Sequence, residues 1–371
     1  MRILLPRRLD EVDLKVGYPS KGAIAGLRPQ EPFQTVSNVG TASTIEFLTQ
    51  TWQRLLQQPA IGPNDNFFDL GGDSALAVQL FSTIADACGQ QLPPVMIYHV
   101  PTIASQAALL DQPSTPELSP LVLLKPGSEG SPVFIAPGLG GGPAEFFQLV
   151  KYIHLPNSVY GLQPKGIEGF DEPCERIEEM ADFYLRAILR FQPRGPYILA
   201  GYSLGGLAAL EMARSLIANG QKVALLVMLD SYPDINFLSP GQRLRLLAQR
   251  TKLRIANFAR PPRTDIRLGG LSSRDEITTF APAFGRVRDC AYLALRRYRP
   301  TFYPGKVKFI RAAIVSEFPD DPDAIWSHLV GSLEVETVPG DHLGMLTTHY
   351  DKLAAVLNRY LDEAASREGI L

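Results

Sequence analysis

The chain has 371 residues, a length that predicts two domains of ordinary size. Hydrophobic residues make up 45% and charged residues 20%, as in soluble globular proteins, and no apolar run approaches the roughly 20 residues of a membrane span. The net charge of −2 lacks the basic excess of nucleic-acid-binding proteins, so neither nucleic acid nor a membrane is expected as a partner.

The cysteines and the N-terminus indicate the compartment. Cys88, Cys174 and Cys290 are scattered without a CxxC pair, so neither a disulfide framework nor a metal site is expected, and a cytoplasmic location is predicted. The apolar run of residues 3–5 is too short for the core of a signal peptide. Residues 1–39, rich in proline, glycine and basic side chains, are predicted to form a leader or linker.

Residues 40–112 have the periodicity of a small all-α helical bundle. A first helix is predicted over residues 45–56, a second from Ser74 and a third from Pro101. Proline and polar residues then dominate residues 113–121, which predicts a semi-rigid interdomain linker.

Residues 122–371 alternate apolar runs with helical patterns. This alternation predicts an α/β fold with a buried, mostly parallel sheet whose strands are connected by crossover helices. Residues 235–283 interrupt the alternation, and an insertion of this length is expected to form a helical lid. The predicted strands are 133–136, 159–162, 197–201, 223–230, 307–310 and 333–338, and the predicted helices are 177–191, 207–218 and 353–361.

Residues 201–205, Gly-Tyr-Ser-Leu-Gly, match the G-x-S-x-G pattern of a nucleophile elbow. The pattern follows an apolar strand and precedes a helical run, which is the context that this turn requires. The glycines leave room for a tight turn that presents a hydroxyl at the edge of the sheet. Ser203 is therefore the predicted nucleophile.

A serine hydroxyl needs a neighbouring base, and the chain order in this fold is serine, then an acid, then histidine. Asp230 ends the next apolar strand, where a carboxylate would face the elbow. His342 follows the last predicted strand on a Pro-Gly-Asp-His loop, whereas His328 has apolar neighbours and His349 approaches the last helix. Asp230 and His342 are the predicted partners, and a capping aspartate and an ordinary loop histidine are the alternatives.

An oxyanion hole requires two backbone N–H groups directed at the developing negative charge. One is expected from Leu204, the residue after the serine. The other is expected from the glycine-rich loop of residues 136–142, where Gly138 or Leu139 is the candidate. The spacing of these glycines matches neither a dinucleotide fingerprint nor a P-loop, which argues against nucleotide binding.

These motifs resemble the type I thioesterase domains that terminate nonribosomal peptide and polyketide synthetases. The resemblance covers roughly residues 120–365 and includes the order and spacing of the motifs. It implies an α/β-hydrolase fold, with helices on both faces of the sheet and a helical lid. It also implies a serine thioesterase, a thioester hydrolase or acyl transferase that forms an acyl-enzyme. The segments that carry it are residues 133–138, 159–163 and 201–206, Asp230 and residues 339–342.

Residues 66–74, Asn-Phe-Phe-Asp-Leu-Gly-Gly-Asp-Ser, resemble the attachment loop of a peptidyl carrier protein. The resemblance implies that Ser74 carries a covalent 4′-phosphopantetheine, and a helix N-terminus would stabilise its phosphodiester. The local pattern alone favours Ser74 or Asp73 as a simple N-cap. The order Lys21-Gly22 departs from the Gly-Lys dipeptide at the end of adenylation domains, so the sequence leaves open whether the chain is a fragment of a larger synthetase.

Together the two resemblances predict a terminal release unit of thiotemplate biosynthesis. Its partners would be upstream synthetase modules or an acyl-loading enzyme and a phosphopantetheinyl transferase. Its substrate would be an acyl or peptidyl thioester, released by hydrolysis or cyclisation. The alternatives are an editing thioesterase, a general esterase and a non-catalytic carrier or docking module. The fused carrier argues against an editing enzyme, because a tether favours one particular carrier. A general esterase would have no use for the Ser74 motif, and a non-catalytic module would not need the intact set of Ser203, Asp230 and His342.

The two parts also differ in charge. Residues 40–118 contain about seven acidic residues and one basic residue, Arg54, whereas residues 240–300 contain about fourteen basic and four acidic residues. Opposite charges on two domains attract and orient them, so the carrier is expected to dock near the basic lid. A solvated basic surface is the alternative.

Overall fold

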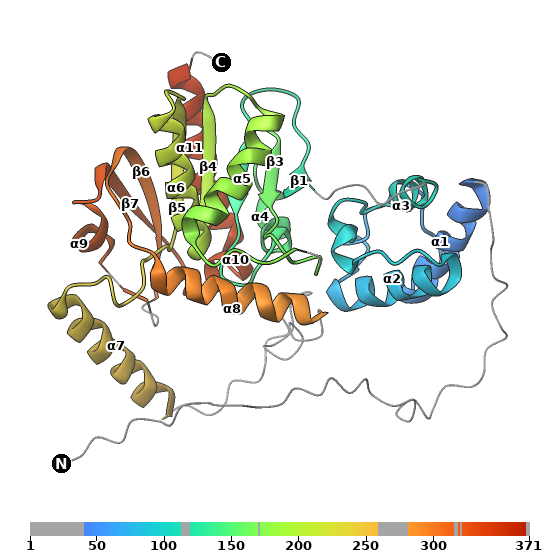
Figure 1. The fold of residues 1–371 in the computed structure, drawn as a ribbon, viewed down its shortest axis with the longest axis horizontal. Coiled ribbons are helices and arrows are strands. Elements are labelled where there is room, and N and C mark those ends of the chain that lie inside the picture. The colour runs from blue at the N-terminus through green and yellow to red at the C-terminus, as the bar shows by residue number, and fades with distance from the viewer. Residues whose placement is uncertain are drawn as a thin grey trace.

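The computed structural model describes residues 41–112, 119–169, 171–258, 281–314, 318–319 and 321–368. A small helical bundle and an α/β part lie side by side (Figure 1). The predicted leader lies outside the described residues, as do residues 113–118 of the predicted linker and residues 259–280 of the predicted lid.

The helical bundle is held together by an apolar core and by defined helix ends. Asp73 caps the second helix, because its carboxylate accepts the N–H of Leu76 at 2.8 Å. The buried indole of Trp52 donates to Gln106 at 3.1 Å and so joins the first helix to the last. The elements are α1 (Thr41–Leu56), α2 (Ser74–Cys88), η1 (Pro94–Tyr98) and α3 (Ile103–Leu110).

The α/β part is built on a sheet that has, among the described residues, seven strands in the order β1-β3-β2-β4-β5-β6-β7. β1 pairs antiparallel with β3, and all other neighbours are parallel, which confirms the predicted fold class. The strands are β1 (Leu121–Lys125), β2 (Val133–Ala136), β3 (Val159–Leu162), β4 (Tyr197–Tyr202), β5 (Val223–Leu229), β6 (Tyr303–Ala312) and β7 (Val330–Val338).

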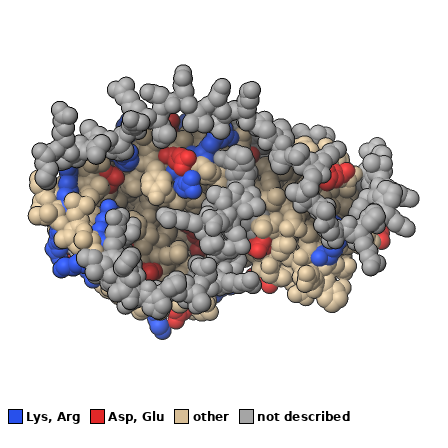
Figure 2. All heavy atoms as spheres, turned by 90° about the horizontal axis from the view of Figure 1, so that it is seen from below, with Lys and Arg blue, Asp and Glu red and all other residues tan. Residues whose placement is uncertain are grey.

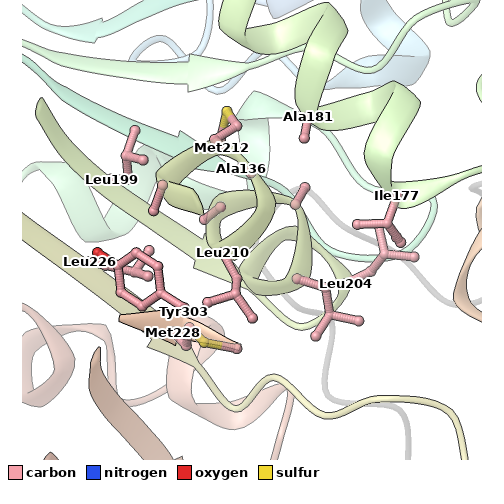
Figure 3. Packing of buried hydrophobic residues seen from close by; sticks show 14 of the residues in the cluster. Ala136, Ile177, Ala181, Leu199, Leu204, Leu210, Met212, Leu226, Met228 and Tyr303 are labelled. Carbon is pink, nitrogen blue, oxygen red and sulfur yellow. The ribbon is translucent and has the colours of Figure 1, made fainter. Parts of the chain in front are cut away.

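Helices cover both faces of the sheet and bury two apolar layers. In the first layer, part of which Figure 3 shows, residues of α6 such as Leu210 lie against Met228 of β5. α5 (Ile177–Phe191), α6 (Leu204–Ala218) and α8 (Ala281–Arg297) belong to this layer. The second layer contains α4 (Phe147–Val150), α10 (Gly344–Thr347) and α11 (Tyr350–Glu368). The remaining described helices are η2 (Pro143–Phe146), α7 (Pro240–Phe258) and α9 (Pro322–Trp326).

The bundle packs against the α/β part through apolar side chains, some of them aromatic. The Phe68 ring stacks on Tyr98 with a centroid distance of 5.5 Å, and both contact Phe147 of α4, at 4.6 and 6.1 Å. One exposed ion pair, between Lys151 and Asp69 at 3.0 Å, lies beside them. The contact is therefore apolar at its centre and charged at its edge.

The basic helix α7, which lies in the predicted lid, is remote from this contact. Figure 1 places α7 at the end of the molecule opposite to the bundle, and on the face seen in Figure 2 most Lys and Arg side chains gather towards that end. α8, which follows the predicted lid, reaches the bundle through Phe284 and Val287. In this arrangement the bundle lies against α8, within the basic residues 240–300, and away from α7. The expected docking near the basic lid stays a prediction, because residues 259–280 of that lid lie outside the described residues.

In the part of the chain that the structure describes, every helix is too short or too polar to cross a membrane.

Candidate active site

Ser203 lies on a strained turn between β4 and α6. Its φ of 54° and ψ of −120° fall where side chains other than glycine are rarely found. Its N–H donates to the carbonyl of Leu229 at 2.8 Å, and its own carbonyl accepts the N–H of Gly206 at 3.1 Å. These hydrogen bonds hold the serine at the C-terminal end of β4, as the G-x-S-x-G pattern predicts.

The glycines around Ser203 have no room for a side chain. A Cβ on Gly201 would lie 2.1 Å from the carbonyl oxygen of Gly205, and one on Gly205 would lie 2.2 Å from that of Ala136. A Cβ on Gly206 would lie 1.9 Å from the hydroxyl of Ser231. The start of α6 therefore approaches the neighbouring strands as closely as backbone allows.

Asp230 and His342 meet beyond the ends of β5 and β7. The Asp230 Oδ2 atom is 2.7 Å from His342 Nδ1, and its Oδ1 atom accepts the N–H of Ala312 at 3.2 Å. Asp230 is only 4% exposed, and its N–H donates to the carbonyl of Ile310 at 2.8 Å. A buried carboxylate on Nδ1 fixes the imidazole so that Nε2 can accept a proton.

The imidazole of His342 lies between two aromatic rings. Tyr202 stacks on it with a centroid distance of 4.8 Å, and the ring of Phe318 lies at 4.0 Å. The Tyr202 hydroxyl also donates to the carbonyl of His342 at 2.8 Å. The carbonyl of Phe318 accepts from the side chain of Gln249 at 2.8 Å, which links the histidine to α7. Both rings thus orient the imidazole.

Removing the Phe318 ring is expected to lower kcat roughly tenfold, because an imidazole with one open face loses its orientation towards the serine. We would compare Phe318→Ala with wild type in the hydrolysis of an N-acetylcysteamine thioester. Phe302→Ala is the matched control, since Phe302 is 57% exposed and directly precedes β6, whereas Phe318 comes after the other end of that strand. Equal kcat values for the two variants would contradict a positioning role for Phe318.

Gly138 and Leu204 line one small cavity, of about 20 Å³. Gly138 is next to the serine, because a Cβ on it would lie 3.6 Å from the Ser203 Cβ. Leu204 is the first residue of α6, where a backbone N–H has no partner within the helix. Leu139 is not among the residues that line this cavity, so the geometry favours Gly138 as the second donor.

A carboxylate that the sequence did not reveal also belongs to this site. The Glu145 Oε2 atom, from the short helix η2, accepts the N–H of Gly138 at 3.0 Å. Desolvation raises the pKa of Glu145 to about 7, although the hydrogen bond from Gly138 opposes this shift. No motif in the sequence marks this contact, since it depends on how the loop after β2 folds back.

The loop before α2 lies on a groove between the bundle and the α/β part. Gly71, Gly72 and Asp73 line one side of this groove, which has a volume of about 780 Å³ and extends to Glu145. Gly71 has a φ of 91°, and apart from its chain neighbours no atom of the described residues lies within 4 Å of a Cβ built on it. Ser74 is the first residue of α2 and follows Asp73 directly, so the groove beside the attachment loop fits a covalently attached phosphopantetheine.

Two family matches decide the classification. Residues 131–361 match the Thioesterase domain, and residues 46–110 match the Phosphopantetheine attachment site. The first match covers more than half of the chain. The chain belongs to the thioesterase domain family. The thioesterase is a thioester hydrolase, and the helical bundle is a carrier domain for covalent 4′-phosphopantetheine.

The thioesterase with its carrier domain is similar to parts of much longer proteins. It is 31% identical over 307 residues to a dimodular nonribosomal peptide synthase of Bacillus subtilis, covering 78% of this chain and 13% of that protein. It is 30% identical over 311 residues to malpibaldin synthetase of Mortierella alpina, covering 80% of this chain and 5% of that one. The chain thus spans a small fraction of these relatives.

A solved structure shares the fold. The crystal structure of a four-domain holo nonribosomal peptide synthetase, bound to AMP and glycine, aligns with a TM-score of 0.52 at 24% identity. The alignment covers 90% of this chain and 27% of that protein. At this level of identity the likeness concerns the fold alone.

Proposed function

We propose that this chain is a release unit, in which Ser203 accepts an acyl or peptidyl group delivered as a thioester on Ser74. The observation that carries the proposal is the groove between the two domains. It is lined by Asp73 next to Ser74 on one side and by Glu145, the partner of Gly138, on the other. The carrier is therefore positioned to serve the adjoining thioesterase.

The proposed mechanism uses His342 as the base. Its Nε2 atom takes the proton of the Ser203 hydroxyl, while Asp230 stabilises the imidazolium through Nδ1–H. The serine oxygen attacks the acyl carbonyl, and the N–H groups of Gly138 and Leu204 stabilise the oxyanion. The carbon–sulfur bond breaks, His342 returns the proton to the sulfur, and an acyl-serine remains. Water or a nucleophile within the acyl chain then releases the product, which gives hydrolysis or cyclisation.

Phosphopantetheine attached to Ser74 supplies a thiol on a long flexible arm. We infer that a phosphopantetheinyl transferase attaches it and that upstream synthetase modules or an acyl-loading enzyme charge it. The synthetases among the relatives support this inference. A fused carrier gives one partner a high effective concentration, which favours release over editing of many carriers.

The cysteines Cys88, Cys174 and Cys290 are free, which supports a cytoplasmic location.

Transfer within the chain is expected to depend on the aromatic contact of Phe147. Phe147→Ala should slow the loss of an acyl group from loaded Ser74 roughly tenfold, because aromatic residues packed in an interface contribute much of its binding energy. Hydrolysis of a free N-acetylcysteamine thioester should not change. The measurement is intact-protein mass against time after loading with an acyl-coenzyme A and a phosphopantetheinyl transferase.

Two variants serve as controls. Phe191→Ala removes a 49% exposed aromatic ring that lies outside the interdomain contact, and it should behave as wild type. Ser74→Ala should gain no phosphopantetheine mass. Wild-type transfer by the Phe147 variant would show that another arrangement delivers the acyl group. If loaded Ser74 keeps its acyl group in the wild-type chain, the release function is wrong.

A further inference from the structure

Glu145 separates two spaces that the proposed reaction has to connect. Its side chain lines the groove that begins at the attachment loop of the carrier. Its carboxylate is hydrogen-bonded to Gly138, which lines the small cavity on the other side together with Leu204. The side chain therefore lies between the groove and the candidate oxyanion hole.

The surroundings of Glu145 hold it over the glycine-rich loop. A Cβ on Gly141 would lie 1.6 Å from Glu145 Oε1, so the carboxylate packs directly on the loop backbone. The titratable groups that face it are Tyr184 of α5 and Tyr202 of β4, and its negative charge helps to raise the pKa of both phenols. Among the described residues, the Glu145 side chain accepts one hydrogen bond, from the N–H of Gly138.

This hydrogen bond conflicts with the catalytic use of Gly138. An oxyanion hole works through N–H groups that point at the developing charge on the acyl oxygen. While Glu145 accepts the Gly138 N–H, the acyl oxygen has to compete with a carboxylate for the same donor. A permanent contact would therefore leave Leu204 as the sole donor in this pair.

We propose that Glu145 is a displaceable gate, which accepts the Gly138 N–H while the site is empty and leaves it when an acyl carbonyl arrives from the groove. The inference rests on the proposed function, because it requires Gly138 as an oxyanion donor. The opposing interpretation is a rigid brace, in which Glu145 holds the loop throughout the reaction. The two interpretations predict opposite changes in rate, since removing a gate accelerates the reaction at Ser203 and removing a brace slows it.

The test is the rate at which a fluorophosphonate labels Ser203 in the full chain. The phosphonyl oxygen takes the place of the oxyanion, so labelling reports access to the Gly138 N–H without a loaded carrier. Glu145→Ala should label roughly tenfold faster than wild type, the size expected for loss of a charged hydrogen-bond competitor. Gln148→Ala is the matched control, because Gln148 lines the same groove close to Glu145 and its side chain is exposed. This variant should be labelled at the wild-type rate.

The isosteric variant Glu145→Gln controls for loss of packing. Its labelling should be faster than that of wild type at pH 8, and the two rates should converge as the pH falls through 7, where the carboxylate gains a proton. The ratio of the two rates cancels any pH effect that the two proteins share. Slower or unchanged labelling of both Glu145 variants would overturn the gate. The variant Ser203→Ala measures labelling at other residues. If the folded wild-type chain is labelled no more than this variant, the assignment of Ser203 as the nucleophile fails instead.

Discussion

Asp230→Asn is expected to lower kcat by roughly four orders of magnitude, as the equivalent change does in a serine protease. Asp230 Oδ2 binds His342 Nδ1, and Oδ1 accepts the N–H of Ala312. An asparagine that keeps the Ala312 bond presents its amide N–H₂ to Nδ1. The imidazole then carries its proton on Nε2, which can no longer take the proton of Ser203.

The change should appear in kcat, with KM nearly constant, because the lost interaction belongs to the transition state. We would measure both constants with an N-acetylcysteamine thioester and follow folding by the thermal midpoint. Asp289→Asn is the matched control, since Asp289 is exposed on α8 and pairs with its neighbour Arg288. A kcat within tenfold of wild type for Asp230→Asn would exclude Asp230 from the catalytic group.

Local patterns predicted the nucleophile more directly than its partners. The close approach of α6 to β2 and β4 requires glycine on both sides of Ser203, so the sequence indicates the turn. Asp230 and His342 were predicted from chain order and from their positions after strands. Their 2.7 Å contact depends on β5 and β7 being parallel strands whose C-terminal ends share one edge of the sheet.

Glu145 and Phe318 had no comparable signal. Glu145 reaches Gly138 because η2 folds back over the loop after β2, and Phe318 reaches His342 from the segment after β6. Neither residue belongs to a motif with a fixed spacing. Contacts of this kind are set by loop conformation, which periodicity and spacing do not encode.

The strands differ in how well the sequence predicted them. β2 and β3 have the predicted bounds, because buried parallel strands are continuous apolar runs. β1 was not predicted, since this edge strand is short and follows a proline-rich segment. β6 begins at Tyr303, four residues before the predicted start, where proline, glycine and lysine obscure the pattern.

Lys308 is buried within β6 because Glu334 and Glu363 both pair with its ammonium group.

Gly205→Ala is expected to destabilise the thioesterase domain by about 2 kcal/mol and to lower kcat roughly a hundredfold. A Cβ at this position would lie 2.2 Å from the carbonyl oxygen of Ala136 and 2.4 Å from that of Pro137. Both atoms belong to the backbone, so no side-chain rotation relieves the clash. The loop after β2 has to move away from α6, and Gly138 moves with it relative to Ser203. Urea unfolding and N-acetylcysteamine thioester hydrolysis measure the two effects.

The control for Gly205→Ala is the same substitution at another helical glycine. Gly285 lies in α8, and outside its own helix turn no atom of the described residues lies within 4 Å of a Cβ built on it. Alanine there should stabilise the helix by about 0.5–1 kcal/mol and leave kcat unchanged, because alanine has the higher helix propensity. The two substitutions should therefore change stability with opposite signs. If Gly205→Ala were as stable and active as Gly285→Ala, the contact between α6 and the loop after β2 would not be what holds Gly138 beside Ser203.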